Sequence, residues 1–341
     1  MRNEQKDASL LALLVLVLFS MSLLAGCGSS KKEAPKVDPA KKFVFKLGHT
    51  ASPDHHYQVG SLKFAELVAK KTNGNVEIKV FPADQLGKQR QLVEGAQLGT
   101  VDMVLTSDVL LSGFEPTVGV LNLPFLFKDM EQVAKVLEGP VGKKLDAALA
   151  KKNLVVVGWW ENGFRHITNS RKPINVPDDL KGLKIRVPEG NVFVETFNSY
   201  GASATPMSFG ELYSALQLKT VDGQENPTTH VLTQKYYEVQ KYLSITNHIH
   251  VAEPLLMSAK VYKTLPAEYQ KALHEAGKEV AVWMMKEIGS QEAKEIEEIK
   301  KRGMLINTAD VNAFKEASKK VYAKFEPVFG KDLIADITSG K

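Results

Sequence analysis

The sequence lacks the short motifs that identify the common enzyme families. It has no G-x-x-x-x-G-K-[ST] phosphate loop, no G-x-S-x-G nucleophile turn, no H-E-x-x-H and no C-x-x-C. No nucleophile is paired with a base. The adjacent carboxylates Asp178 and Asp179 follow a proline in a turn, where they cap the next segment. These absences predict a protein that is not an enzyme and needs no cofactor.

A recognisable metal-binding pattern is also missing. His55-His56 and His248-x-His250 are the only histidine clusters in the sequence. Neither has a cysteine or an acidic residue beside it at the spacing that a zinc site requires. We therefore expect these histidines to lie on the surface of loops or strands, and we expect no metal site.

The sequence also has only a small excess of charge of one sign. Lys and Arg number 44 against 39 Asp and Glu, a formal charge of +5, and the lysines are mixed with glutamates along the chain. This argues against nucleic-acid binding, which needs a concentrated basic surface, and is compatible with anionic small ligands. With 44% hydrophobic and 24% charged residues the chain is an ordinary soluble globular protein, and 341 residues suit two domains better than one.

Cysteine is almost absent, since Cys27 is the only one and no disulfide can form within the chain. The apolar run Leu10–Leu24 has 15 residues, short of the roughly 20 that span a bilayer. An apolar run of this length followed by small residues is typical of a signal peptide, here residues 1–26. The segment "LAGC" that ends it resembles a bacterial lipobox, whose cysteine is lipidated. The alternative is a leftover thiol. Residues 27–42, rich in lysine, proline and serine, are expected to be a flexible tether. The mature protein would be exported and lipid-anchored to the cell membrane, facing the periplasm or the outside.

The remaining chain alternates strand and helix patterns in two series. In the first series the predicted strands are "FVFKLGH", "VEIKVFP" and "VDMVLTS", with helices between them. The first of these helices carries Val59, Leu62, Leu67 and Val68 at roughly helical spacing. A second series follows Gly163, with strands at "FRHITNS", "LKIRVP" and "ASATP" and helices at "NVFVETFNSYG" and "SFGELYSALQLK". Such alternation predicts an α/β fold with parallel strands and right-handed crossovers in each of two domains.

Two further features support this organisation. The pattern Q-L-x-T-V-D occurs at residues 97–102 and again at 217–222, each time where a helix is expected to end and a strand to begin. Residues 266–302 carry an apolar stripe at helical spacing, with Gly289 as a position where a kink could form and Gly303 as the stop. A helix of that length spans about 55 Å, at about 1.5 Å per residue, which exceeds the width of one domain. We therefore expect it to cross both.

Three polar residues stand where a ligand could be bound. Arg186 ends the apolar strand "LKIRV", so its guanidinium is expected at the carboxyl edge of the sheet, where open α/β sheets bind ligands. A guanidinium offers two parallel N–H donors that match a carboxylate. Arg165, in "NGFRHITNS", is a second candidate, and Asn226 in "GQENP" is held extended by the following proline. The alternatives to a ligand-binding role are that the arginines are exposed to solvent or form salt bridges, and that Asn226 only stabilises a turn.

The segments "PINVPDDLKGLKIRVPEG", "YGASATPMSFGELYSALQLKTVDGQENP" and "KYYEVQKYLSITNH" resemble the solute receptor of TRAP transporters, the DctP family. The resemblance covers nearly the whole chain from Phe43 onward. It implies a bilobal, periplasmic-binding-protein-like fold of type II, with a hinge and a long helix crossing both lobes. The implied boundaries are residues 43–162 plus about 251–290 for lobe I, 163–250 plus about 291–318 for lobe II, and 319–341 for C-terminal helices packing on lobe I.

The same resemblance implies the function and the site. Such receptors close over a small organic acid anion and deliver it to a permease with one small and one large membrane subunit, driven by an ion gradient. Arg186 would hold the carboxylate, Arg165 would assist, Asn226 would hydrogen-bond the ligand and Phe209 would line the pocket. His49 and Gln85 or Gln89 are the candidates from lobe I. The motifs favour a C4-dicarboxylate slightly over a sugar acid. We also expect a monomer. The alternatives are an exported enzyme acting on a small carboxylic acid and a ligand-sensing partner of a membrane kinase.

Overall fold

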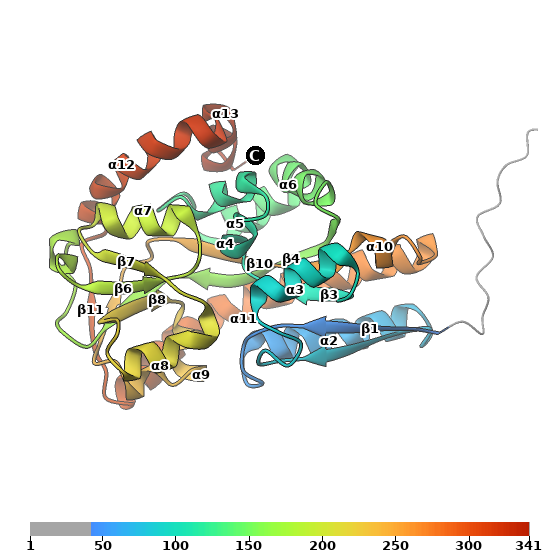
Figure 1. The fold of residues 1–341 in the computed structure, drawn as a ribbon, viewed down its shortest axis with the longest axis horizontal. Helices are drawn as coiled ribbons and strands as arrows, with labels where there is room; N and C mark the ends of the chain where they lie inside the picture. Colours follow the sequence, from blue (N-terminus) through green and yellow to red (C-terminus); the bar gives the residue numbers. More distant parts are fainter. Residues whose placement is uncertain (1–41, 341) are drawn as a thin grey trace, which may run out of the picture. The chain divides into compact units, whose positions relative to one another are not determined.

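The computed structural model describes residues 42–340, and the expected signal peptide, the lipidation site Cys27 and nearly all of the tether lie outside them. Within residues 42–340 no helix has both the length and the apolar character to cross a bilayer. Two β-sheets organise this part of the chain, one in each lobe (Figure 1). The bilobal α/β fold expected from the sequence is therefore confirmed.

The first lobe contains a five-stranded sheet in the order β2-β1-β3-β10-β4. β1 pairs in parallel with β2 and β3, as predicted, while β10 runs antiparallel to β3 and β4. Sequence patterning did not identify β10, because all nine of its residues are buried and no polar alternation marks it. The strands are β1 (Phe43–Gly48), β2 (Val76–Phe81), β3 (Met103–Leu105), β4 (Leu154–Phe164) and β10 (His250–Ser258); the helices are α2 (His56–Lys71), α3 (Gln89–Leu98), α4 (Asp108–Leu111), α5 (Met130–Glu138), α6 (Pro140–Ala150) and α10 (Ala259–Tyr262).

The second lobe contains a six-stranded sheet in the order β11-β9-β5-β8-β6-β7. β6 lies parallel to β7 and β8, whereas β5 is antiparallel to both of its neighbours, β8 and β9. The expectation of parallel strands throughout was therefore wrong for β5, because it enters this sheet directly from β4 without a helical crossover. The strands are β5 (His166–Asn169), β6 (Lys184–Val187), β7 (Ser203–Pro206), β8 (Gly223–Asn226), β9 (Tyr242–Ile245) and β11 (Leu305–Thr308); the helices are α7 (Asn191–Ser199), α8 (Leu212–Gln217) and α9 (Thr228–Thr233).

The repeated Q-L-x-T-V-D segment makes the same contacts in both lobes. The backbone N–H of Thr100 donates to the carbonyl of Gly95, and that of Thr220 donates to the carbonyl of Ala215. The carboxylate that ends each copy accepts a backbone N–H from a neighbouring strand, 2.8 Å from Lys46 in the first lobe and 2.9 Å from Lys184 in the second. Gly99 and Lys219 both adopt the left-handed conformation that ends the preceding helix. The motif therefore forms the same helix-to-strand junction twice.

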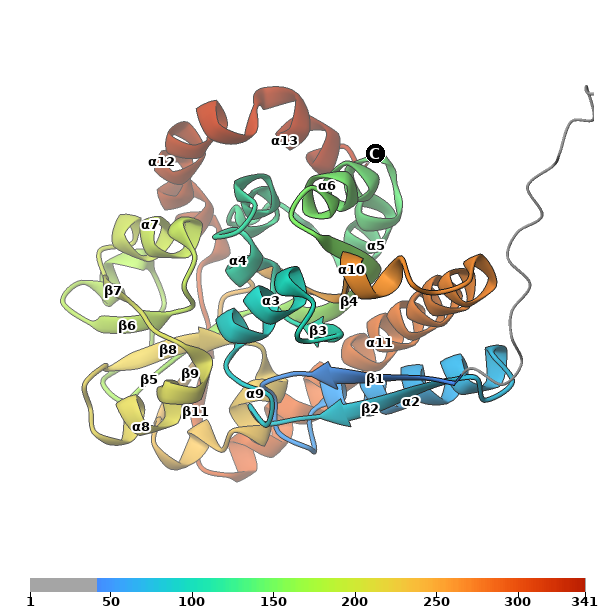
Figure 2. The same cartoon turned by 45° about the vertical axis from the view of Figure 1, so that its right-hand side comes forward.

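Helix α11 (Ala267–Lys301) crosses from one lobe to the other, as the sequence predicted (Figures 1 and 2). Its first half packs on β4, where the indole of Trp160 donates to the Gly277 carbonyl at 3.0 Å. Its second half reaches the other lobe, where Glu295 accepts hydrogen bonds from Thr228 and Thr229 at 2.6 and 2.7 Å. The helix continues without a break through Gly289.

The C-terminal helices also contact both lobes. Helix α12 (Val311–Phe329) begins beside α7, where Phe314 packs edge-on against Tyr200. Further along, Val321 of α12 and Leu333 of α13 (Lys331–Thr338) join the core of the first lobe. Two connections between the sheets and two crossing helices thus hold the lobes together.

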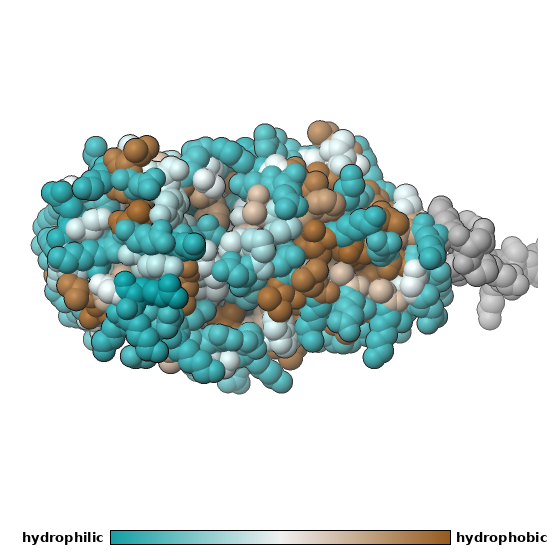
Figure 3. Space-filling model, turned by 90° about the horizontal axis from the view of Figure 1, so that it is seen from below, coloured by the Kyte–Doolittle hydropathy of each residue, from teal (hydrophilic) through white to brown (hydrophobic). Residues whose placement is uncertain are grey.

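Helix α2 is rotated relative to the expected stripe. Its buried side chains include Tyr57, Phe64 and Val68, whereas Val59 and Leu62 are about half exposed. Figure 3 shows apolar side chains gathered on this side of the first lobe, where α2 lies against α11. The helix predicted from this spacing is present, but Val59 and Leu62 lie outside the core because His56 and Tyr57 occupy the side of the helix that faces the interior.

Candidate ligand site between the lobes

A small cavity of about 30 Å³ lies between the two lobes. It adjoins an outer cavity of about 210 Å³, and both include Thr50, Gln89 and Phe209. A roomier apolar cavity of about 300 Å³ lies elsewhere, among α5, α6, β4 and α11, but no arginine lines it. The small cavity is the one with convergent polar groups, which are typical of a ligand site. Its lining residues are Thr50, Tyr57, Gln89, Ser107, Val109, Asn162, Arg165, Arg186, Pro188, Phe209, Asn226, His230 and Glu253.

Arg186 is a buried cation without an acidic partner. It lies on β6 with 2% of its surface exposed, because Ile185 and Val187 on either side anchor the strand in the core. Its Nε and Nη2 both donate to the Met207 carbonyl, at 3.0 and 2.7 Å. Among residues 42–340 no carboxylate forms an ion pair with it, so its Nη1 stays available. Burial lowers the pKa of Arg186 to about 10, although the nearby Tyr236 and Glu225 oppose this shift.

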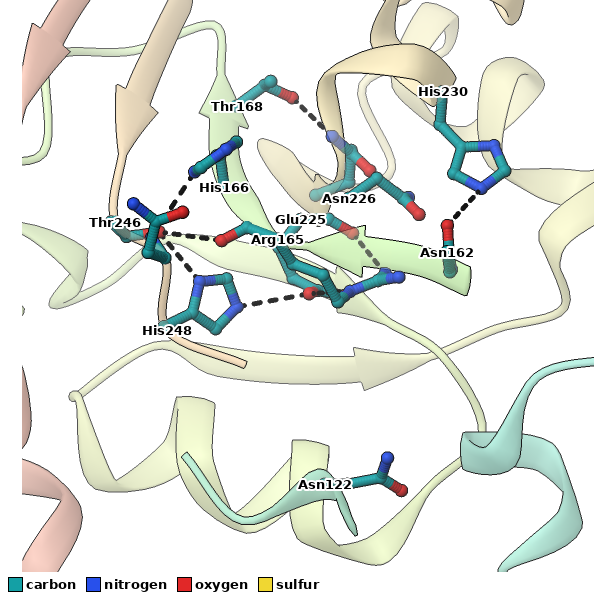
Figure 4. Close-up of polar contacts among 12 residues, drawn as sticks. Asn122, Asn162, Arg165, His166, Thr168, Glu225, Asn226, His230, Thr246 and His248 are labelled. Atoms are coloured by element: carbon teal, nitrogen blue, oxygen red, sulfur yellow. Dashed lines mark hydrogen bonds and ion pairs between the residues drawn. The ribbon is translucent and has the colours of Figure 1, made fainter. Parts of the chain in front are cut away.

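Arg165 is equally buried but has an acidic partner (Figure 4). Its Nε and Nη2 form a bidentate pair with the carboxylate of Glu225 at 2.6 and 2.8 Å, and Nη2 also donates to the Glu225 carbonyl. Burial alone would lower the pKa of Arg165, but the charge and hydrogen bonds of Glu225 outweigh it and raise that pKa. The ring of His248 lies 3.2 Å from the same carboxylate. Because Arg165 connects β4 to β5, this pair sits where the chain crosses between the lobes.

Asn226 ends β8 at the cavity wall, as its position before Pro227 predicted (Figure 4). Its side-chain amide donates to the Gln224 side chain at 2.5 Å, which fixes the orientation of the group. Gln224 donates in turn to the hydroxyl of Thr168 at 2.9 Å. The oxygen of the Asn226 amide is thereby left for a ligand.

The first lobe contributes an acidic group that sequence reasoning missed. Glu253 on β10 is 1% exposed, and the hydroxyl of Tyr57 donates to its Oε2 at 2.8 Å. Burial, with a further contribution from the charge of Asp108, raises the pKa of Glu253 to about 8. The available signal was a single carboxylate inside the apolar run "VAEPLLMS".

We predict that Glu253→Gln raises the melting temperature, and raises it more at pH 8 than at pH 5. The pKa of Glu253 is about 8 in the folded protein, well above its ordinary value near 4.5. Between these values the unfolded chain loses a proton that the folded protein keeps, so the wild type loses stability as pH rises through this window. A glutamine side chain at this position has no proton to lose. Each kcal/mol of stability gained raises the melting temperature by roughly 2–4 °C in scanning calorimetry. A difference in melting temperature between Glu253→Gln and the wild type that does not change with pH would contradict the raised pKa of Glu253.

The histidine clusters do not lie at the surface, and that expectation was wrong. His55, His248 and His250 are almost fully buried, and His56 is nearly so. The His55 ring stacks on His230 of the other lobe with centroids 4.3 Å apart. Burial lowers the pKa of both rings well below the ordinary value, which keeps them neutral. The residues that the structure describes contain no group of three or more potential metal ligands.

Most of the predicted site residues lie together. Arg186, Arg165, Asn226, Phe209 and Gln89 all line the cavity. His49 and Gln85 do not: His49 is fully buried and its Nε2 lies 2.8 Å from Gln58, while Gln85 lines neither the inner nor the outer cavity. In place of these two, the first lobe offers Tyr57, Thr50, Ser107 and Glu253.

Comparison with known proteins places the chain in a family. Residues 47–327 match the model of the bacterial extracellular solute-binding proteins, family 7 (DctP). The 2,3-diketo-L-gulonate-binding periplasmic protein YiaO of Escherichia coli is 35% identical over 273 residues, which cover 80% of this chain and 83% of YiaO. The C4-dicarboxylate-binding periplasmic protein DctP of Rhodobacter capsulatus is 37% identical over 241 residues, 70% of this chain and 71% of that protein.

Solved structures agree with this placement. A TRAP periplasmic solute-binding protein from Polaromonas sp. JS666, bound to D-erythronate, superposes with a TM-score of 0.85 at 38% identity and covers 87% of this chain and 99% of its own. One from Sulfurospirillum deleyianum with bound succinate has a TM-score of 0.83 at 31% identity, over 88% of this chain and 100% of its own. The chain therefore belongs to the bacterial extracellular solute-binding proteins of family 7, the DctP family of TRAP solute receptors.

Proposed function

We propose that this protein captures a small organic acid anion between its two lobes, with Arg186 as the residue that holds the ligand's carboxylate. The observation that carries the proposal is a fully buried guanidinium with no carboxylate in contact among residues 42–340. Burying an unpaired charge costs several kcal/mol, so an anion that enters the cavity and pairs with it removes that cost. Arg165 does not have this need, because Glu225 already neutralises it.

Binding would favour closure of the lobes, because the cavity wall comes from both. Arg186, Asn226 and Phe209 belong to the second lobe, whereas Tyr57 and Gln89 belong to the first. A ligand that contacts both walls stabilises the closed state over the open one, and closure removes water and strengthens the ion pair. The closed receptor would deliver the anion to a two-subunit, ion-gradient-driven permease. Lipid anchoring through Cys27 and a monomeric state stay predictions from the sequence.

The chemical class of ligand follows from similar proteins. The compared relatives and structures carry names or ligands that include 2,3-diketo-L-gulonate, D-erythronate and succinate, all of them small carboxylates. The family therefore supports a small organic acid, and it includes both sugar acids and C4-dicarboxylates. These relatives are receptors rather than enzymes, and we propose that this chain likewise returns its ligand unchanged.

A thermal-shift panel tests the proposal. The purified protein is heated with dicarboxylates, 2-oxo acids, hydroxy acids, aldonates and uronates, and with the primary amide of each acid as a matched control. We expect at least one acid to raise the melting temperature in a concentration-dependent way while its amide does not. A panel in which no acid stabilises the protein would contradict the proposed function.

A further inference from the structure

The first lobe's wall of the cavity is acidic. Glu253 is the one ionisable acid that this lobe places in the inner cavity, and within residues 42–340 no lysine or arginine forms an ion pair with it. A second buried carboxyl, Asp108, lies behind it and accepts hydrogen bonds from Asn122 at 2.9 Å and from the Ala252 backbone at 3.0 Å. Ala252 precedes Glu253 in β10, and the Asp108 charge contributes to the raised pKa of Glu253, after burial.

The opposite wall supplies only one uncompensated positive charge. Arg165 and Glu225 cancel each other, which leaves Arg186. The two imidazoles nearest the cavity, His230 and His55, add no charge, because burial holds their pKa values well below the ordinary range. The inner cavity can therefore neutralise one negative charge on a ligand.

The outer cavity has no surplus of positive charge either. Two of its lining residues are cations, Lys88 and Arg90, and three are acids, Asp84, Glu189 and Glu211. Lys88 is already paired with Glu211 at 2.5 Å, a contact that joins the two lobes. Arg90 has no ion-pair partner among residues 42–340 and lies over the Phe114 ring, 5.4 Å from its centroid, but it lines only the outer cavity. A second carboxylate could therefore meet an unpaired cation only on a ligand that extends out of the inner cavity past Phe209.

From this distribution of charge we infer that the site selects hydroxylated monocarboxylates over dicarboxylates of the same length, with Glu253 as the residue that discriminates. The inference rests on the proposed function and reverses the slight preference for a C4-dicarboxylate that the motifs indicated. A monoanion neutralises Arg186. A dianion would bring a second, uncompensated charge into a water-poor cavity beside two carboxyls, which disfavours it electrostatically.

The chemistry of a hydroxyl fits Glu253 whichever protonation state it holds. An ionised carboxylate accepts a hydrogen bond from the hydroxyl, and a neutral carboxylic acid donates one to the hydroxyl's oxygen. A second ligand carboxylate could approach only if a proton were held between the two groups. Tyr57 fixes the discriminating group in place through its bond to Oε2, so Tyr57 acts as a positioning residue.

The test compares acids that differ only at the end away from the binding carboxylate. Isothermal titration at pH 9, above the pKa of about 8 that burial gives Glu253, measures Kd for D-erythronate against meso-tartrate, and for 4-hydroxybutyrate against succinate. In each pair a CH₂OH group replaces a carboxylate. We expect the wild type to bind the monocarboxylate at least tenfold more tightly. If no four-carbon acid binds, the same comparison of Kd values is made between the six-carbon acids galactonate and galactarate.

Two variants separate discrimination from general damage to the site. Glu253→Gln keeps the size and hydrogen bonds but removes the acid, and we expect it to reduce the ratio of the two Kd values at least fivefold, mainly by tighter dicarboxylate binding. Tyr57→Phe loosens Glu253 and should reduce the ratio by a smaller factor. Equal or tighter binding of the dicarboxylate by the wild type, or a ratio unchanged within twofold in Glu253→Gln, would overturn the inference. Failure of every acid to bind would instead contradict the proposed function.

Discussion

Arg186→Lys is expected to weaken acid binding at least tenfold. The Arg186 guanidinium uses Nε and Nη2 on the Met207 carbonyl and keeps Nη1, beside Nη2, for a carboxylate. A lysine ammonium is one centre of charge and cannot bond the backbone carbonyl and a bidentate carboxylate in the same way. Losing one of two charge-assisted bonds corresponds to about 1.5–3 kcal/mol, or roughly a tenfold to hundredfold change in Kd.

The control for this measurement is Arg302→Lys. Arg302 is an exposed arginine on the surface, where it pairs with Glu298 at 2.9 Å near the end of α11, far from the cavity lining. Titration calorimetry with the acid that stabilises the protein most should give the wild-type Kd for this variant. An affinity of Arg186→Lys within threefold of wild type would show that Arg186 does not hold the ligand.

Glu225→Gln is expected to destabilise the protein by about 3–5 kcal/mol, the cost of leaving one partner of a buried ion pair alone. Glu225 is fully buried and supplies both oxygens of the bidentate pair with Arg165. Without it, two guanidiniums, Arg165 and Arg186, would lie in one small cavity in which neither forms an ion pair with a carboxylate among residues 42–340. The melting temperature should fall by several degrees in differential scanning calorimetry, and added ligand should recover part of the loss.

Glu298→Gln serves as the matched control, since it also removes a carboxylate from an arginine, but at the surface. Exposed ion pairs contribute little, so its melting temperature should match that of the wild type. A Glu225→Gln variant that melts within one degree of the wild type would mean that the Arg165–Glu225 pair does not stabilise the region where the chain crosses between the lobes.

The sequence identified Arg186 and Asn226, which line the cavity from lobe II, because the signals for both are local. Arg186 was recognisable as a charge at the end of an apolar strand, and Asn226 as an amide held extended before a proline. Both signals are contained within a few residues. The helix-to-strand junctions at Gly99 and Lys219 were predictable for the same reason, since the turn chemistry lies within the motif itself.

The lobe I part depends on tertiary packing, which local patterns do not report. Glu253 enters the cavity because β10 lies in the middle of a sheet between β3 and β4, and Tyr57 because α2 is rotated from its apparent apolar stripe. The same limitation explains the histidines: His55 is buried by His230, which lies 175 residues further along the chain. His49 was a reasonable candidate by position, but Gln58 engages its ring within the first lobe.

The proposed function would divide two tasks between the lobes. The second lobe provides the cation that an acid needs, together with a neutralised arginine where the chain crosses between the sheets. The first lobe places hydroxyls, amides and an acid on the cavity wall, and these would contact the rest of the ligand. Affinity for a carboxylate and choice among carboxylates would therefore respond to different substitutions.

A crystal structure with the most stabilising acid bound tests the central claim most directly. We predict that one carboxylate of the ligand lies against Arg186, with oxygens about 2.7–2.9 Å from Nη1 and Nη2, while the Arg165–Glu225 pair stays intact. A carboxylate bound instead outside the cavity, or held without contact to Arg186, would contradict it.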